Sequence, residues 1–359
     1  MVGNSKPQLF TPFALRDLTI PNRVLLSPMG QHSADEGVPS DWHLMHLGQY
    51  AVSGVGCVIT EAAAVSPSAR ISQGCLGIWG PEHAKGFARI RDFFDRYGSA
   101  KFGIQLNHCG RKGSVMKRWE RSKPVSVEDG GWVVEGASTI GYPGRVAPVP
   151  FTPDRLKDLA ADFANAARQA HDGGLDLIEI HAAHGYLLHS FLSPLSNNRG
   201  DRYGGSLENR MRFPLEVFEA TRAAWPVGKP IGVRVSTTDW AAGGWTEEET
   251  LVLCAELKKR GCDYICASSG GTTPDQQIPV EPHYQIPFAE RIRREVGIAT
   301  AAVGLITEPQ DAENIIAERK ADFVALGRAL LWDPRWVWHA AKALGAKTTF
   351  PHQYDDVFR

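Results

Sequence analysis

The sequence has no long hydrophobic run, and no apolar stretch approaches the roughly 18 residues that a transmembrane helix needs. The first residues, MVGNSKPQLFTPF, also lack the apolar run of a signal peptide. An excess of charge of either sign is missing too, because 39 lysines and arginines oppose 40 acidic residues and leave a formal net charge of −1. We therefore expect neither a nucleic acid nor a membrane surface as a partner.

Cysteine is also scarce, with six residues and no CxxC pair. Cys262 and Cys266 lie four residues apart in an apolar stretch, a spacing that places both side chains on one face of a strand. The pattern indicates reduced, mainly buried thiols and predicts a cytoplasmic protein.

No GxGxxG fingerprint follows any apolar run, which disfavours the main alternative fold, an open doubly wound sheet. Eight short runs rich in Val, Ile and Leu alternate instead with segments of helical apolar spacing. This alternation predicts a parallel sheet, and eight such strands close into a (β/α)8 TIM barrel of the α/β class. Without repeats or linkers, residues 1–359 are expected to form one domain. The expected strands are 23–28, 56–61, 102–107, 175–180, 230–235, 262–267, 298–303 and 322–327.

A long connection follows the third expected strand. Residues 108–150 contain Trp119, Trp132 and many glycines. So long a connection in a compact domain is usually a lid or a substrate-binding insertion. Because it follows a strand, we expect it to cap the carboxyl-terminal mouth of the barrel.

Polar residues at the strand ends are candidates for a site, because chemistry in this fold collects there. The fourth strand ends in the stretch EIHAAHGY, which supplies His181, His184 and Tyr186. Gln105 and Arg234 lie near the ends of the third and fifth strands. An amide that both donates and accepts suits a heterocycle with adjacent carbonyl and nitrogen groups, and an arginine would stabilise negative charge on it.

The seventh and eighth strands end in glycines, with an arginine beside the second: Gly304, Gly327 and Arg328. Strands seven and eight are where such barrels commonly bind phosphate. The glycines could also be simple turn formers and the arginine a surface ion pair. Taken together, the strand ends fit a phosphorylated ring cofactor, and flavin mononucleotide (FMN) meets both demands.

Several motifs resemble the old yellow enzyme family of FMN-dependent ene-reductases, in its bacterial xenobiotic-reductase-like or thermophilic-like branch. They are LFTPFALRDLTIPNRVLLSPM, DWHLMHL, ITEAAAVSPSARIS, GIQLNHCGRK, IEIHAAHGYLLHSFLSPLSNNRGDRYGGSLENRMRF, VGLITEPQDAE and VALGRALLWDPRW. They run in family order from about Phe10 to Gly345.

The resemblance implies one FMN per barrel, NADPH or NADH as reductant, and a small-molecule substrate: an α,β-unsaturated carbonyl compound such as an enone or a quinone-like xenobiotic. Its activated C=C bond takes a hydride from flavin N5, while His181 and His184 hydrogen-bond the carbonyl and Tyr186 protonates the α-carbon. His32 and Trp336 would contact the substrate. The residues implied to bind FMN are Ser27, Pro28, Met29, Gly30, Ala62, Gln105, Arg234, Gly304, Gly327 and Arg328.

Two positions depart from the pattern of this branch. Gly30 stands where a flavin-adjacent cysteine is usual, and His32 stands where a substrate-contacting tyrosine is usual. We hypothesise an altered flavin potential and an unusual or bulkier substrate, because an imidazole differs from a phenol in shape and in protonation near neutral pH. The same scaffold could alternatively desaturate or aromatise a cyclic substrate, or isomerise a double bond.

Two other interpretations of the histidine pair remain. His181 and His184 could bind zinc in a barrel hydrolase, although a catalytic zinc needs a third protein ligand. They could also be structural hydrogen-bond partners. The resemblance further implies a homodimer or larger homo-oligomer, in which the C-terminal stretch FPHQYDDVFR reaches the neighbouring subunit's site.

Overall fold

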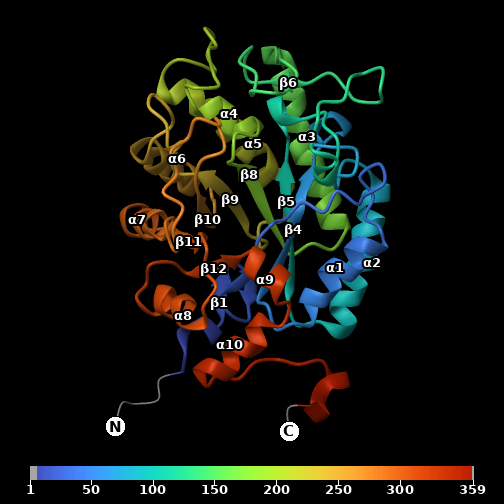
Figure 1. Ribbon diagram of the computed structural model, residues 1–359, viewed down its shortest axis with the longest axis vertical. Coiled ribbons are helices and arrows are strands. Elements are labelled where there is room, and N and C mark those ends of the chain that lie inside the picture. The colour runs from blue at the N-terminus through green and yellow to red at the C-terminus, as the bar shows by residue number, and fades with distance from the viewer. Residues whose placement is uncertain (1–5, 358–359) are drawn as a thin grey trace.

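Eight parallel strands close into a barrel in the computed structural model, which describes residues 6–357 (Figure 1). Each strand pairs with its neighbours in chain order, and the last pairs with the first, so the predicted (β/α)8 barrel is confirmed. The strands are β3 (Val24–Leu26), β4 (Cys57–Ala64), β5 (Lys101–Asn107), β8 (Leu177–Ala182), β9 (Ile231–Ser236), β10 (Tyr264–Ser268), β11 (Ala299–Ala302) and β12 (Phe323–Leu326).

Helices connect the strands and cover the outside of the barrel. Their ends follow local signals: the Thr152 hydroxyl accepts a hydrogen bond from the backbone N–H of Arg155 at 3.2 Å, and Pro153 opens the first turn. The long helices are α1 (Asp41–Ala51), α2 (Pro81–Tyr97), α3 (Pro153–Asp172), α5 (Leu207–Ala224), α6 (Glu247–Lys259), α7 (Ile286–Val296), α8 (Pro309–Ala317) and α10 (Trp336–Leu344), and the short ones are α4 (Leu187–Leu192) and α9 (Arg328–Trp332).

An N-terminal hairpin closes the floor of the barrel. Strands β1 (Phe13–Leu15) and β2 (Leu18–Ile20) pair in antiparallel fashion, and the Phe13 ring packs edge-on against that of Phe323 with centroids 5.0 Å apart. Leu15 and Ile20 belong to the same apolar cluster as side chains from inside the barrel. A ligand therefore enters from the opposite, carboxyl-terminal mouth.

The long connection of residues 108–150 lies beyond the carboxyl end of β5, at the top of Figure 1. It contains only short elements: η3 (Gly110–Lys112), η4 (Arg118–Glu120), β6 (Glu135–Gly136) and β7 (Val149–Pro150). The Arg199 guanidinium stabilises the last part of this connection by donating to the carbonyls of Ala137 and, just after it, Phe151, both at 2.8 Å. Its role as a lid stays a prediction.

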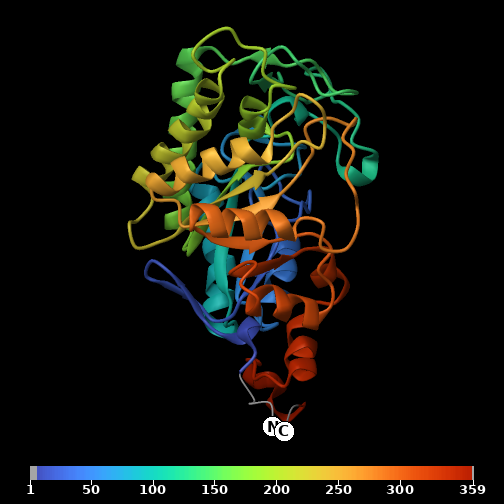
Figure 2. The same cartoon turned by 90° about the vertical axis from the view of Figure 1, so that its left-hand side faces the viewer.

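Residues 350–357 of the C-terminal segment pack on their own chain at the other end of the molecule, and residues 358–359 lie outside the described residues (Figure 2). The rings of Phe350 and Tyr354 lie 5.0 and 6.1 Å from that of Trp338, centroid to centroid. Its contact with a neighbouring subunit stays a prediction. All six cysteines are free and buried. Within residues 6–357, none of the helices combines the length and the apolar character needed to cross a membrane.

Candidate active site

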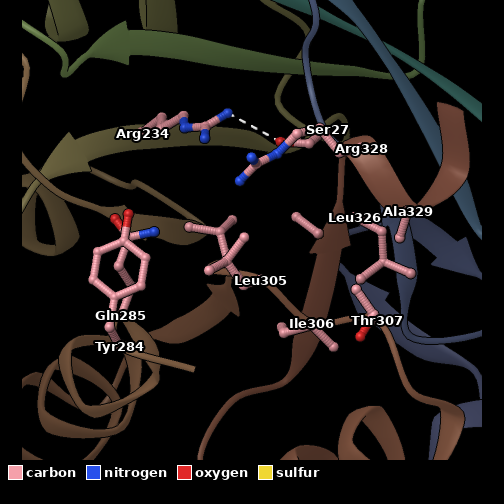
Figure 3. Close-up of a pocket in the computed structure, with 14 residues that line it drawn as sticks. Ser27, Arg234, Tyr284, Gln285, Leu305, Ile306, Thr307, Leu326, Arg328 and Ala329 are labelled. Atoms are coloured by element: carbon pink, nitrogen blue, oxygen red, sulfur yellow. Dashed lines mark hydrogen bonds between the residues drawn. The ribbon is translucent and has the colours of Figure 1, made fainter. Parts of the chain in front are cut away.

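Two adjoining cavities open at the carboxyl ends of the barrel strands, and Arg234 of β9 lines both. The first, of about 190 Å³, lies at the ends of β11 and β12 (Figure 3). The second, of about 340 Å³, lies at the ends of β4, β5 and β8. Most of the predicted site residues line one or the other: Ser27, Gly304, Gly327 and Arg328 the first, and Pro28, Gly30, His32, Ala62, Gln105, His181, His184 and Tyr186 the second.

The first cavity presents backbone and positive charge. Gly304 and Leu305 have positive φ angles of 120° and 56°. Gly327 leaves space, since a Cβ there would lie 3.4 Å from the sulfur of Met29. Figure 3 shows the guanidinium groups of Arg234 and Arg328 on the same side of the cavity. Backbone groups beside two guanidinium groups fit an anionic group such as a phosphate.

Arg234 and Gln105 join the two cavities. Arg234 donates from Nη1 to the Ser27 hydroxyl at 3.1 Å, while its buried Nε has no hydrogen-bond partner within the described chain. An unpaired buried donor is costly, so it indicates an acceptor that a ligand supplies. Gln105 donates to the buried Glu179 at 2.8 Å, which leaves its carbonyl oxygen and second N–H for the cavity. These donors and acceptors fit the polar edge of a flavin ring.

Glu179 is a residue that sequence analysis missed. Its carboxylate lies inside the barrel, 1% exposed, and accepts hydrogen bonds from Gln105 and, at 3.0 Å, from the Tyr264 hydroxyl. Burial raises the pKa of Glu179, and the positive charge of Arg234 opposes that rise. The signal that could have found it is an acidic residue inside the buried strand: Asp176 precedes β8, whereas Glu179 lies within it between Ile178 and Ile180.

A sharp turn after β8 brings His184 and Tyr186 beside His181. His184 and Gly185 both have left-handed backbone conformations, with φ of 58° and 71°. Gly185 is required, because a Cβ there would lie 2.3 Å from the carbonyl oxygen of Gly271. The His181 ring packs edge-on against the rings of His184 and Tyr186, with centroids 5.1 and 5.0 Å apart.

Both imidazoles are neutral at pH 7. Burial, followed by the positive charge of Arg234, holds the pKa of His181 and of His184 well below the usual 6.5. The backbone N–H of Ala183 donates to Nδ1 of His181 at 3.2 Å, which leaves the proton of that ring on Nε2. His184 Nε2 lies 2.8 Å from the Ser268 hydroxyl, and its Nδ1 lies 3.4 Å from Nε2 of His181.

Tyr186 keeps its proton, because burial raises the pKa of its phenol above the usual 10. Hydrogen bonds to His189 and Lys112 stabilise the turn that carries Tyr186. The backbone N–H of Gly185 donates to His189 Nδ1 at 2.8 Å, and His189 pairs with the fully buried Asp239 at 3.1 Å. Lys112 donates to the carbonyl of His184 at 2.7 Å, and burial lowers the pKa of that lysine to about 7.

Comparison with known proteins identifies this arrangement. Residues 8–347 match the model of the NADH:flavin oxidoreductase / NADH oxidase family. The chain belongs to this family. It is therefore an NAD(P)H-dependent flavin oxidoreductase of old yellow enzyme type, and its cofactor is FMN.

Individual relatives agree with this identification. The chain is 42% identical to the NADPH dehydrogenase of Geobacillus sp. (strain WCH70) over 353 residues, which is 98% of each chain. It is 40% identical to the NADPH dehydrogenase of Bacillus subtilis (strain 168) over 351 residues, covering 97% of this chain and 98% of the relative. The solved structure of morphinone reductase superposes with a TM-score of 0.80 at 27% identity, over 97% of this chain and 92% of that one.

Two predicted residues lie outside the cavities of this flavin oxidoreductase. Trp336 is buried at the start of α10 and donates from its indole to the carbonyl of Thr307 at 2.6 Å, and it lines neither cavity. Met29 lines neither cavity, and its sulfur lies beside Gly327. As for the zinc interpretation, no group of three or more His, Cys, Asp or Glu side chains within residues 6–357 is placed to hold a metal ion.

Gly30 and His32, the two positions predicted to depart from the branch pattern, lie side by side in the structure. A Cβ on Gly30 would lie 3.3 Å from Nε2 of His32, so the imidazole lies directly beside the position that a side chain at residue 30 would take. His32 has a left-handed backbone conformation, with φ of 49°, and its Nδ1 lies 2.8 Å from the Ser72 hydroxyl. Burial lowers the pKa of His32, and the nearby Glu61 opposes that shift.

We expect the substitutions Gly30→Cys and His32→Tyr to be strongly non-additive. Gly30→Cys alone places a side chain against the His32 ring, so the substrate range and the flavin midpoint potential should both change. Adding His32→Tyr removes that imidazole, and the effect on kcat/KM should shrink by a coupling free energy of about 0.5–3 kcal/mol. Both quantities are to be measured for the parent, each single variant and the double variant. Additive effects, or no change on Gly30→Cys, would show the interpretation to be wrong.

Proposed function

We propose that this enzyme reduces the activated C=C bond of α,β-unsaturated carbonyl compounds, with NADPH or NADH as the reductant. The observation that carries the proposal is the grouping of two neutral imidazoles and one protonated phenol in a single cavity, beside Arg234. Two uncharged N–H donors suit a carbonyl oxygen, and a phenol that stays protonated suits a general acid.

Bound FMN supplies the hydride that the β-carbon of the alkene receives. The carbonyl oxygen of the substrate gains negative charge as the enolate forms, and N–H groups of His181 and His184 stabilise that charge. The proton of His181 is already on Nε2, so this ring donates without a change of tautomer. The substrate oxygen replaces Nδ1 of His184, 3.4 Å away, as its acceptor. His184 can donate to the substrate in the tautomer that carries its proton on Nδ1; the Ser268 hydroxyl, 2.8 Å from Nε2, is then the donor to that nitrogen.

Tyr186 then completes the addition. Its phenol gives a proton to the α-carbon, so that one hydride and one proton are added across the C=C bond. The buried Lys112 lies 5.5 Å from the centre of the Tyr186 ring, and its positive form would stabilise the phenolate until a solvent proton restores it. Arg234, Gln105 and the backbone at Gly304 would hold the cofactor in place.

The test is a visible spectrum of the purified holoenzyme, followed by anaerobic addition of NADPH and then of 2-cyclohexenone. We expect the oxidised flavin bands to bleach with NADPH and to return with the enone. A flavin that bleaches and is not reoxidised by enones would overturn the proposal. It would favour the alternative reactions of this scaffold, which are desaturation, aromatisation or isomerisation of a cyclic substrate. Gly30 and His32 are the residues that suggest this alternative.

A further inference from the structure

The long connection of residues 108–150 brings an excess of positive charge to the mouth of the second cavity. It carries seven lysines and arginines against four acidic residues, whereas the whole chain has a formal net charge of −1. Two of these arginines, Arg118 and Arg145, line the cavity that also contains His181, His184 and Tyr186.

Neither arginine is neutralised by its surroundings. Arg118 is exposed in η4, and Arg145 is half-buried and donates to the backbone carbonyl of Ser122. In the part of the chain that the structure describes, neither has a carboxylate within 4.0 Å. Three of the four acidic residues of the connection lie in other contacts. Glu120 accepts from the backbone N–H of Lys117 at 3.1 Å, Asp129 accepts from the Ser126 hydroxyl at 2.8 Å, and Glu135 lies 3.8 Å from Arg155.

The cavity itself supplies little opposing charge. Glu61 is the one acidic residue among its lining side chains within the described chain. Its carboxylate is buried and already accepts hydrogen bonds from Nε2 of His43 at 3.0 Å and from the backbone N–H of Gln31 at 2.9 Å. Arg118 and Arg145 therefore add positive charge to the cavity lining that Glu61 does not offset. Guanidinium groups match carboxylate and phosphate geometry, so these two side chains suit an anion.

We propose that Arg118 and Arg145 form an anion-binding subsite, so that the enzyme prefers alkenes that carry a carboxylate or phosphate at the end remote from the C=C bond. The preference for such alkenes rests on the function proposed above. A phosphate of NADPH is the other source of the same chemistry, because the reductant has to reach the flavin through the same mouth.

The test compares two maleimides of the same shape, N-(4-carboxyphenyl)maleimide and N-(4-carbamoylphenyl)maleimide, as substrates of the holoenzyme. Both carry an activated C=C bond, and only the first is an anion. All six cysteines are buried, which limits reaction of the probes with thiols. We expect the wild type to show a higher kcat/KM for the carboxylate, and the difference to shrink as salt screens the charge.

The variant Arg118→Gln/Arg145→Gln should lower the ratio of kcat/KM values, carboxylate over amide, by about tenfold, because charge-assisted hydrogen bonds are lost. Arg121→Gln is the matched control, since Arg121 lies in the same connection, is exposed and does not line the cavity. Flavin content and thermal unfolding show that each variant is folded.

Two further measurements separate the sources of the anion and do not depend on the proposed reaction. If a nucleotide phosphate occupies the subsite, the dissociation constant of NADPH, measured by anaerobic flavin reduction, rises in the double variant. Calorimetric titration of the oxidised enzyme with benzoate and with benzamide measures the charge preference without turnover. In the double variant, loss of the carboxylate preference with the maleimides, loss of the benzoate preference, or weaker NADPH binding supports the subsite and names its ligand. An unchanged double variant in all three overturns it, whereas failure to reduce either maleimide counts against the proposed function alone.

Discussion

Replacing Tyr186 by phenylalanine is expected to slow reoxidation of the reduced flavin by an enone by about 100- to 10,000-fold, the usual contribution of a positioned general acid. Reduction of the flavin by NADPH should continue at its normal rate, because that step needs no proton from the phenol. The substitution removes only the hydroxyl, which has no hydrogen-bond partner within residues 6–357, so the fold should keep its stability.

The pH dependence of flavin reoxidation by the enone tests the role of Tyr186 independently. Because burial raises the pKa of Tyr186, the phenol stays protonated beyond its usual value of 10, and alkene reduction should not fall near that pH for lack of the acid. Lys112 behaves in the opposite sense. Burial lowers its pKa to about 7, so its positive charge is lost as the pH rises through neutrality. We therefore expect a modest decline in the reoxidation rate above pH 7, as Lys112 loses its charge.

Stopped-flow spectroscopy of the two half-reactions is the measurement. Tyr142→Phe is the matched control, because Tyr142 also packs over Lys112, with Nζ 4.3 Å from its ring centre, but does not line the cavity. An equal loss in both half-reactions of Tyr186→Phe, or a loss of similar size in Tyr142→Phe, would remove Tyr186 from the role of proton donor.

The barrel is predictable from sequence because parallel strands that are buried on both faces consist of short apolar runs. All eight expected runs are strands, and their boundaries shift where local chemistry decides. β4 continues to Ala64, three residues past its expected end, because a shift of register between Ile59 and Ala62 lets pairing with β5 resume beyond Glu61. β3 ends at Leu26, before the Pro28 that lacks a backbone N–H.

The site is only partly predictable, and the reason is positional. His181, Gln105 and Arg234 lie on strands, so the strand pattern alone orders them around the mouth. Arg118 and Arg145 lie in a connection without periodic pattern, and nothing local shows that the chain folds back over the cavity there. The place of Trp336 could not be predicted either, since its nearness in sequence to β12 says nothing of which way α10 turns its indole.

His181→Ala is expected to reduce the rate of enone reduction by about 100- to 1,000-fold, the loss typical of removing one donor to a developing oxyanion. His181 is the better site for this test than His184, because His184 has a positive φ of 58° that alanine tolerates poorly. His181→Asn is the matched variant, since its amide restores an N–H donor, and we expect a smaller loss. Equal rates in the alanine and asparagine variants would mean that donation by residue 181 is not what the reaction needs.

The pH dependence of stability helps to distinguish an oxyanion donor at His181 from a purely structural histidine. The folded pKa of His181 and of His184 lies well below the 6.5 of the unfolded chain, so the unfolded state binds more protons as the pH falls. The free energy of unfolding should therefore be unaffected by these groups above pH 6.5 and should fall as the pH drops below it. The parent holoenzyme should lose stability on acidification more steeply than His181→Asn, which lacks one of the two buried imidazoles. A structural histidine would show this difference in denaturation without the rate loss, and an oxyanion donor must show both.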